Sequence, residues 1–278
     1  MNDHIDRLGS AVIQYGPAND RVYLMKLGGD DPARTARRLE TLAREEGYSK
    51  IIAKVPGEAK EAFTAAAYRA EARVPRFYHG ERDVHFMAKY LAEERRRPEA
   101  PEQLAEVLTA ARNRRPEDAP PSLDDRYRWR IAEPGDAEAM AALYRRVFAT
   151  YPFPIHDPAY LRRTMAENVV YFGIWQQKEL MALASAEMDV AGCNVEMTDF
   201  ATRPELRGGG FATFLLARME EEMRRRRLAT AYTIARAVSF GMNITFARRG
   251  YRYGGTLTNN TNISGSLESM NVWYKPLA

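Results

Sequence analysis

The sequence predicts an α/β protein of two parts, with α+β character and a mixed sheet in the second part. Strand-like and helix-like segments alternate on both sides of a segment rich in Pro and Arg, and such alternation favours a layered sheet over a helical bundle. In the second part, a triple glycine separates a β-rich run from an amphipathic helix. We therefore expect a smaller N-terminal α/β domain at 1–95, a connector at 96–125 and a larger domain at 126–278.

The N-terminal domain is predicted from two strand-helix pairs. Residues 21–27 contain the β-rich run Val-Tyr-Leu-Met, and 32–46 have the apolar spacing of a helix that ends at Gly47. A buried strand at 50–55 and a helix at 58–66 follow. In the connector, prolines interrupt regular structure because they lack an amide donor, and the helical spacing of 103–111 predicts one short helix between them.

The C-terminal domain is predicted to contain most of the sheet. Asp136 is expected to cap a helix that includes Met140 and Val147. Two further helices are expected at 211–227 and 243–249. The β-rich runs fall at 127–131, 169–175, 180–188, 195–202, 232–237, 253–257 and 269–275.

The composition limits the classes of function. Among 278 residues, 45% are hydrophobic and 28% charged, as in ordinary globular proteins, and the net charge of +4 does not indicate nucleic acid. A single cysteine, Cys193, excludes an intrachain disulfide and favours a reducing cytoplasm. Neither a secretory signal nor an apolar run of membrane-spanning length is present. The four histidines are too scattered for a metal site. We expect a cytoplasmic protein without metal, membrane or nucleic-acid partners.

The triple glycine Gly208-Gly209-Gly210 is the strongest signal for a ligand. Glycines lack the Cβ atom that would block an approaching ligand, and the N-terminus of the following helix offers unpaired amides and a positive dipole end. The segment therefore predicts a phosphate or pyrophosphate site. A tight turn without a ligand would also use glycine, and no Lys-Ser/Thr pair follows the glycines as in a nucleotide P-loop.

Arg207, Gly210 and Ala212 match the phosphate-binding motif Gln/Arg-x-x-Gly-x-Gly/Ala of the GNAT superfamily of acetyltransferases, which the sequence resembles over 127–278. The resemblance implies acetyl-CoA as the acetyl donor, with its pyrophosphate on the amides of 208–213 and its pantetheine arm paired with the backbone of 200–202. The cofactor-binding residues that it implies are Phe200, Ala201, Thr202, Arg207, Gly208, Gly209, Gly210, Phe211, Ala212, Thr213, Asn243 and Phe246.

Within that superfamily the sequence resembles the β-lysine N6-acetyltransferases over almost its whole length. The segments that carry this resemblance are 19–25, 47–50, 77–80, 255–260 and 270–275. The resemblance implies acetylation of the terminal amine of β-lysine to N6-acetyl-β-lysine, a compatible solute. Two alternatives stay open, namely an acetyltransferase for another amine (a polyamine, lysine or a protein lysine) and a CoA-binding regulator without turnover.

The chemistry of amine acetylation requires a base. An alkylammonium group with a pKa of about 10.4 must lose a proton before its nitrogen can attack a thioester. Glu196 and Asp199 are the candidates, and their odd spacing places them on opposite faces of an ideal strand. We favour Glu196 as the base, with Asp199 or Glu187 holding a cationic substrate. A purely structural role for these carboxylates is the alternative.

The acid that protonates the leaving thiolate is harder to assign. Many GNAT enzymes have a tyrosine where this chain has Phe246, which leaves Tyr251, Tyr253 or solvent, although Tyr251 also fits the core. In the C-terminal hairpin, the amides of four asparagines could bind an amino-acid acceptor, or they could form the turn. These asparagines are Asn259, Asn260, Asn262 and Asn271.

The two parts of the chain resemble each other. Residues 62–71 and 85–91 parallel 245–251 and 271–277, which predicts that both parts end in a helix followed by two strands. The first part has no triple glycine. We therefore expect a degenerate GNAT-like half that binds no cofactor and either covers the acceptor site or forms the interface of a homodimer.

Overall fold

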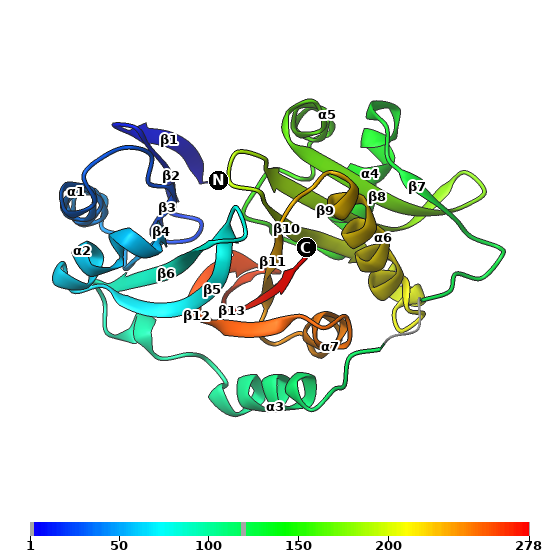
Figure 1. The fold of residues 1–278 in the computed structure, drawn as a ribbon. Helices are drawn as coiled ribbons and strands as arrows, with labels where there is room; N and C mark the ends of the chain where they lie inside the picture. Colours follow the sequence, from blue (N-terminus) through cyan, green and yellow to red (C-terminus); the bar gives the residue numbers. More distant parts are fainter. Residues whose placement is uncertain (1–2, 118–120, 278) are drawn as a thin grey trace.

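The computed structural model describes residues 3–117 and 121–277, and their strands form one continuous sheet of thirteen strands (Figure 1). The sheet crosses from the N-terminal half, blue to cyan in Figure 1, into the C-terminal half, where the last strands are orange and red. The strand order is β1-β2-β3-β4-β6-β5-β12-β13-β11-β10-β9-β8-β7.

The N-terminal half follows the predicted alternation. The strands and helices expected at 21–27, 32–46, 50–55 and 58–66 are present, whereas the first two strands were not predicted. Its elements are β1 (His4–Leu8), β2 (Ala11–Gly16), β3 (Arg21–Lys26), α1 (Pro32–Glu45), β4 (Lys50–Pro56), α2 (Lys60–Ala65), β5 (Arg69–Tyr78) and β6 (Arg82–Tyr90). The connector contains the expected helix, α3 (Pro101–Arg112).

The C-terminal half contains the predicted strands and one unpredicted helix, α5, whose start is marked by the capping side chain of Asp157 and by Pro158. Asp136 precedes α4 as expected, but its side chain does not cap that helix, because it accepts from Arg130 and from the Glu133 amide. The elements are β7 (Arg128–Ile131), α4 (Ala137–Val147), α5 (Pro158–Glu167), β8 (Val169–Gln176), β9 (Glu179–Asp189), β10 (Asn194–Thr202), α6 (Phe211–Arg225), β11 (Thr230–Arg236), α7 (Phe240–Arg248), β12 (Arg252–Ile263) and β13 (Ser266–Pro276).

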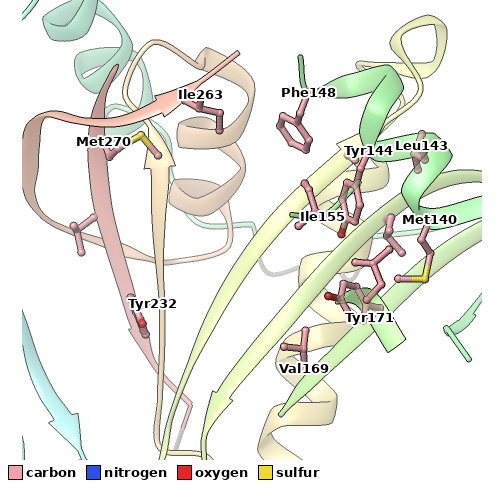
Figure 2. Close-up of a cluster of buried hydrophobic side chains, with 14 of the residues drawn as sticks. Met140, Leu143, Tyr144, Phe148, Ile155, Val169, Tyr171, Tyr232, Ile263 and Met270 are labelled. Atoms are coloured by element: carbon pink, nitrogen blue, oxygen red, sulfur yellow. The ribbon is translucent and has the colours of Figure 1, made fainter. Parts of the chain in front are cut away.

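Helices cover both faces of the C-terminal sheet. Alternate side chains of β8 point to opposite faces, as a strand requires. Tyr171 packs with Met140 and Tyr144 of α4 (Figure 2), whereas Phe172 packs with Leu215 of α6. This two-sided burial explains why the strand reads as a nearly continuous apolar run.

The two halves have the same order of elements and the same pairing of strands. The series β1-β2-β3-α1-β4-α2-β5-β6 is repeated as β8-β9-β10-α6-β11-α7-β12-β13. In each half the third strand is parallel to the fourth, with Arg21 opposite Lys50 and Asn194 opposite Thr230. Both halves therefore end in a helix followed by two strands, as the internal similarity predicted.

The halves meet where β5 and β12 pair antiparallel. Their register pair is Ala72 with Gly255. Because Tyr68 corresponds to Tyr251 in the internal similarity, Ala72 and Gly255, each four residues further on, occupy equivalent positions in the two halves. An approximate two-fold axis that relates the halves therefore passes through this pair. A Cβ atom on Gly255 would lie 2.1 Å from the Glu71 carbonyl oxygen. Only glycine therefore permits this close approach of the two halves.

Arg95 ties the halves together through buried polar contacts. Its Nε donates to the Asn259 carbonyl at 2.7 Å, and its Nη1 contacts Asp20 Oδ2 at 2.9 Å. The amide of Asn259 in turn donates to the carbonyls of Arg95 and Arg97. Burial makes these contacts costly to break, because the groups left behind would stay dehydrated.

We expect Arg95→Ala to lower the free energy of unfolding by about 3 kcal/mol, because it leaves Asp20 and the carbonyls of Asn19 and Asn259 without the guanidinium that donates to them. Arg96→Ala is the matched control. Arg96 is exposed and its contact with Glu93 spans 3.4 Å, so the change should stay below about 0.5 kcal/mol. Urea unfolding of both variants measures the difference, and equal losses would contradict this account.

Candidate functional site

A bulge in β10 opens the centre of the C-terminal sheet. The parallel pairing of β10 with β11 stops at Glu196 opposite Tyr232. Beyond that point the register between β10 and β9 shifts between Thr198 and Ala201, and Asp199 adopts a left-handed conformation with φ 55°. A bulge of this kind bends the strand and turns side chains from their regular faces. The expectation that Glu196 and Asp199 face opposite sides is therefore wrong, since both line one cavity.

This cavity has a volume of about 170 Å³ and is lined by both halves of the chain. The sheet curves so strongly that Lys54 Nζ on β4 lies 3.5 Å from the Tyr232 hydroxyl on β11, although four strands separate β4 from β11. The first half contributes Arg21, Tyr23, Met25 and Lys54.

Glu196 has the electrostatics of a general base. It stands directly opposite Glu187 on β9. Burial, reinforced by the charge of Glu187, raises the pKa of Glu196 to about 7, although Lys54 and a hydrogen bond with Tyr232 oppose the shift. Burial likewise raises the pKa of Glu187. A carboxylate that titrates near neutral pH can accept a proton and release it again under ordinary conditions.

Asp199 is held more firmly than Glu196. Its two oxygens accept hydrogen bonds from the hydroxyls of Tyr151 and Ser185. Burial raises the pKa of Asp199, whereas these hydroxyls lower it. Because its oxygens already have protein donors, Asp199 is better suited to holding charge in place than to moving a proton.

The loop before α6 has the features of an anion site. Gly208 and Gly210 have φ of 84° and 78°, and a Cβ atom at either position would meet open space among the described residues. The first intrahelical hydrogen bond comes from the Phe214 amide, so the amides of Phe211, Ala212 and Thr213 have no helical partner. Exposed Arg207 precedes them. These residues fit a pyrophosphate group.

The equivalent helix of the first half is built differently. At α1, the Asp31 side chain accepts from the Arg34 amide at 2.6 Å, and Pro32 removes a donor. The carboxylate thus occupies the position that an anion would need.

Several predicted site residues lie in or beside the cavity. Phe200 and Phe246 line it and contact each other edge to face, with ring centroids 5.6 Å apart. Asn260 also lines it. Ala201 and Thr202 follow the bulge on β10. They pair with β9 on one side, but on the other side the strand no longer pairs with β11.

Other predicted residues serve the fold. The Asn243 amide donates to the Arg236 and Ser239 carbonyls and accepts from Asn271 and Trp273. Its hydrogen-bonding capacity is thereby filled, and neither Asn243 nor Asn271 lines the cavity.

The remaining corrections concern the C-terminal hairpin. Tyr251 packs against Phe246 in the core and does not reach the cavity. Asn259 joins the two halves through Arg95, as described above. The hairpin turns at Ser264 and Gly265, so the asparagines do not form the turn.

Sequence reasoning missed all five tyrosines that line the cavity with the carboxylates. Each looks like an ordinary core or loop residue in its own segment, and only the fold brings them together. They are Tyr23, Tyr151, Tyr160, Tyr171 and Tyr232. Among the described residues, no group of three or more His, Cys, Asp or Glu side chains could hold a metal ion, and no helix is long and apolar enough to cross a membrane.

Known proteins are similar to this chain over nearly its whole length. The β-lysine N(6)-acetyltransferase of Methanococcus maripaludis is 40% identical over 98% of both chains. The N-acetyltransferase YodP of Bacillus subtilis is 32% identical over 96% of both. The β-lysine N(6)-acetyltransferase of Methanosarcina mazei is 32% identical, covering 87% of this chain and 96% of that protein.

Residues 137–251 match the acetyltransferase (GNAT) family. The match runs from the start of α4 to the end of α7 and includes the glycine loop and the bulged strand. The chain is therefore an N-acetyltransferase that belongs to the GNAT acetyltransferases, in the family of the β-lysine N(6)-acetyltransferases.

Proposed function

We propose that this enzyme transfers the acetyl group of acetyl-CoA directly to the terminal amine of β-lysine, giving N6-acetyl-β-lysine, a compatible solute. The observation that carries the proposal is the buried Glu196, with its pKa near 7, in a cavity on β10, the strand that precedes the glycine loop and α6. Two full-length relatives named β-lysine N(6)-acetyltransferase support the choice of acceptor.

The residues before and within the first turn of α6 would hold the donor. Gly208, Gly210 and the amides of 211–213 would bind the pyrophosphate, with Arg207 beside it. The backbone edge of 200–202 that does not pair with β11 would align the pantetheine arm. Acetyl-CoA supplies an activated thioester when it is bound there.

Glu196 would take a proton from the acceptor's ammonium group, which frees the nitrogen lone pair for attack on the acetyl carbon. Glu187 and Asp199 would favour binding of the acceptor in its cationic form, since negatively charged carboxylates attract an ammonium group. Tyr251 and Tyr253 do not line the cavity. Of the acids considered, solvent would therefore supply the proton for the leaving thiolate, and solvent would also accept the second proton that the acceptor nitrogen loses after attack.

Acceptor profiling tests the proposal. Release of the CoA thiol is measured with β-lysine, α-lysine, spermidine and a lysine peptide offered separately, and the acetylated position is found by mass spectrometry. We expect β-lysine to be preferred and acetylated on its terminal nitrogen. Preference for another amine would rule out β-lysine as the acceptor. Binding of acetyl-CoA without any turnover would favour a CoA-binding regulator.

A homodimer and a cytoplasmic location stay predictions, as does the expectation that the first half binds no cofactor. The capped start of α1 supports the last of these. Light scattering on the purified chain measures the oligomeric state.

We expect Gly210→Glu to abolish measurable binding of acetyl-CoA, because it places bulk and negative charge where the pyrophosphate would sit. Gly210→Ala is the control for backbone strain, since any side chain at φ 78° is disfavoured. Calorimetric titration should show a much smaller loss for alanine. Wild-type affinity in Gly210→Glu would remove the donor site from this loop.

We expect kcat/KM for the acceptor to fall as pH drops below about 7, because protonated Glu196 cannot accept a proton. Glu196→Gln should lower kcat by roughly 10²–10⁴-fold and remove this dependence. Glu45→Gln changes an exposed carboxyl on α1 and should match the wild type at every pH. A pH profile that survives in Glu196→Gln would assign the base elsewhere.

We also expect Glu196→Gln to stabilise the fold at pH 8. The folded state raises the pKa of Glu196 above the ordinary value of 4.5, so ionisation costs stability as pH rises through that interval. Glutamine removes a cost of about 1–3 kcal/mol at pH 8, and the gain should vanish near pH 4, where both states are protonated. Thermal unfolding at both values measures it, and an equal gain at each pH would refute the assignment.

A further inference from the structure

Arg21 on β3 is a buried cation at the cavity wall. Its side chain is 4% exposed, and it lines the cavity together with Tyr23 and Asn260. Burial lowers the pKa of Arg21 to about 10, which still leaves the guanidinium charged at neutral pH. A buried charge is costly unless it is paired, so the surroundings of Arg21 need an explanation.

Arg21 has no close counter-ion among the described residues, although the charge of Asp3 acts on it. Within residues 3–117 and 121–277, no carboxylate forms a salt bridge with it, in contrast to the other cavity arginine, Arg236, whose Nε and Nη2 both contact Glu268. The charge of Lys54, the third cation of the wall, acts on Glu187 and Glu196 and opposes the rise in the pKa of each.

The hydrogen bonds of Arg21 leave one edge of its guanidinium nearly free. Nη1 donates to the Asn260 carbonyl and to Thr261 Oγ1. Nη2 has only a long contact of 3.4 Å to Gln14 Oε1, and the buried Nε has no partner among the described residues. Nε and Nη2 form the edge that grips a carboxylate with two parallel hydrogen bonds, as Arg236 grips Glu268.

The cavity is therefore electrically polarised. Its negative wall comes from the C-terminal half, through Glu187, Glu196 and Asp199, and Arg21 comes from the N-terminal half. Tyr23 lies in the field of both sides, since Glu196 raises its pKa and Arg21 lowers it. The Arg21 guanidinium also lies 5.3 Å from the Tyr23 ring centroid. A ligand with an ammonium group at one end and a carboxylate at the other would match this arrangement.

We propose that the Arg21 guanidinium binds the carboxylate of an amino-acid acceptor, while the reacting amine lies at Glu196. The inference rests on the proposed acetyl transfer to an amine and adds that the acceptor must carry a carboxylate at its far end. Arg21 is thus a specificity-determining residue, contributed by the half that has no glycine loop. Polyamines, which have no carboxylate, would leave its charge buried and unpaired.

The test compares acceptors that differ only in the carboxylate. The pairs are β-lysine with its carboxamide, and lysine with 1,5-diaminopentane, each at saturating acetyl-CoA. We expect the wild type to favour the acid over its partner by on the order of 100-fold in kcat/KM. In Arg21→Gln this preference should fall to about threefold or less, while kcat/KM for the carboxylate-free partner stays within about threefold of the wild type.

Two further variants protect the conclusion. Arg37→Gln changes an exposed arginine on α1 and should keep the wild-type preference. If Arg21→Gln does not fold, Arg21→Lys carries the test, because lysine keeps the charge but loses the paired donors, and its preference should fall by about tenfold.

The outcomes separate this inference from the proposed function. If lysine rather than β-lysine is the better acceptor and its preference depends on Arg21, the choice of β-lysine fails but the inference stands. An acid preference unchanged in the Arg21 variants would overturn the inference. Equal losses for both members of a pair would also overturn it, since they indicate a structural role alone. So would turnover of polyamines only.

Discussion

The burial of three carboxylates on one wall is the constraint on which the rest of the site depends. Glu187, Glu196 and Asp199 repel one another and lose hydration inside the cavity. Tyrosine hydroxyls and Lys54 offset that cost only in part, because the pKa of Glu196 stays raised. The buried carboxylates thus destabilise the fold at the place where they are chemically useful. The packing of the sheet against helices on both faces must offset this loss of stability.

The cavity requires both halves of the chain. The glycine loop and the carboxylates belong to the C-terminal half, whereas Arg21, Tyr23 and Lys54 belong to the N-terminal half. The sheet passes from one half to the other through a single register pair, and Arg95 fixes their relation with buried hydrogen bonds. Under the proposals above, the C-terminal half would bind the donor, and both halves would take part in recognising the acceptor.

The sequence predicted what is encoded locally. The glycine loop and most helices and strands could be located from spacing and residue type, and the candidate base Glu196 from its place on a central strand. The bulge at Asp199 could not be predicted, because no residue of β10 marks the register shift against β9. Tyr23 and Asn259 act through contacts between segments far apart in the sequence, so Tyr23 resembled a core residue and Asn259 resembled a substrate-binding amide although it joins the halves.

The register pair of Ala72 with Gly255 has a further consequence for the origin of the fold. In a symmetric dimer an isologous contact joins a patch to its own copy, and every change of sequence occurs twice. Here the equivalent strands β5 and β12 meet as they would in such a dimer, but they belong to one polypeptide. Duplication and fusion release each copy from that symmetry. One copy can then keep the donor loop while its twin diverges towards the acceptor, a division of labour that no homodimer of identical chains can evolve.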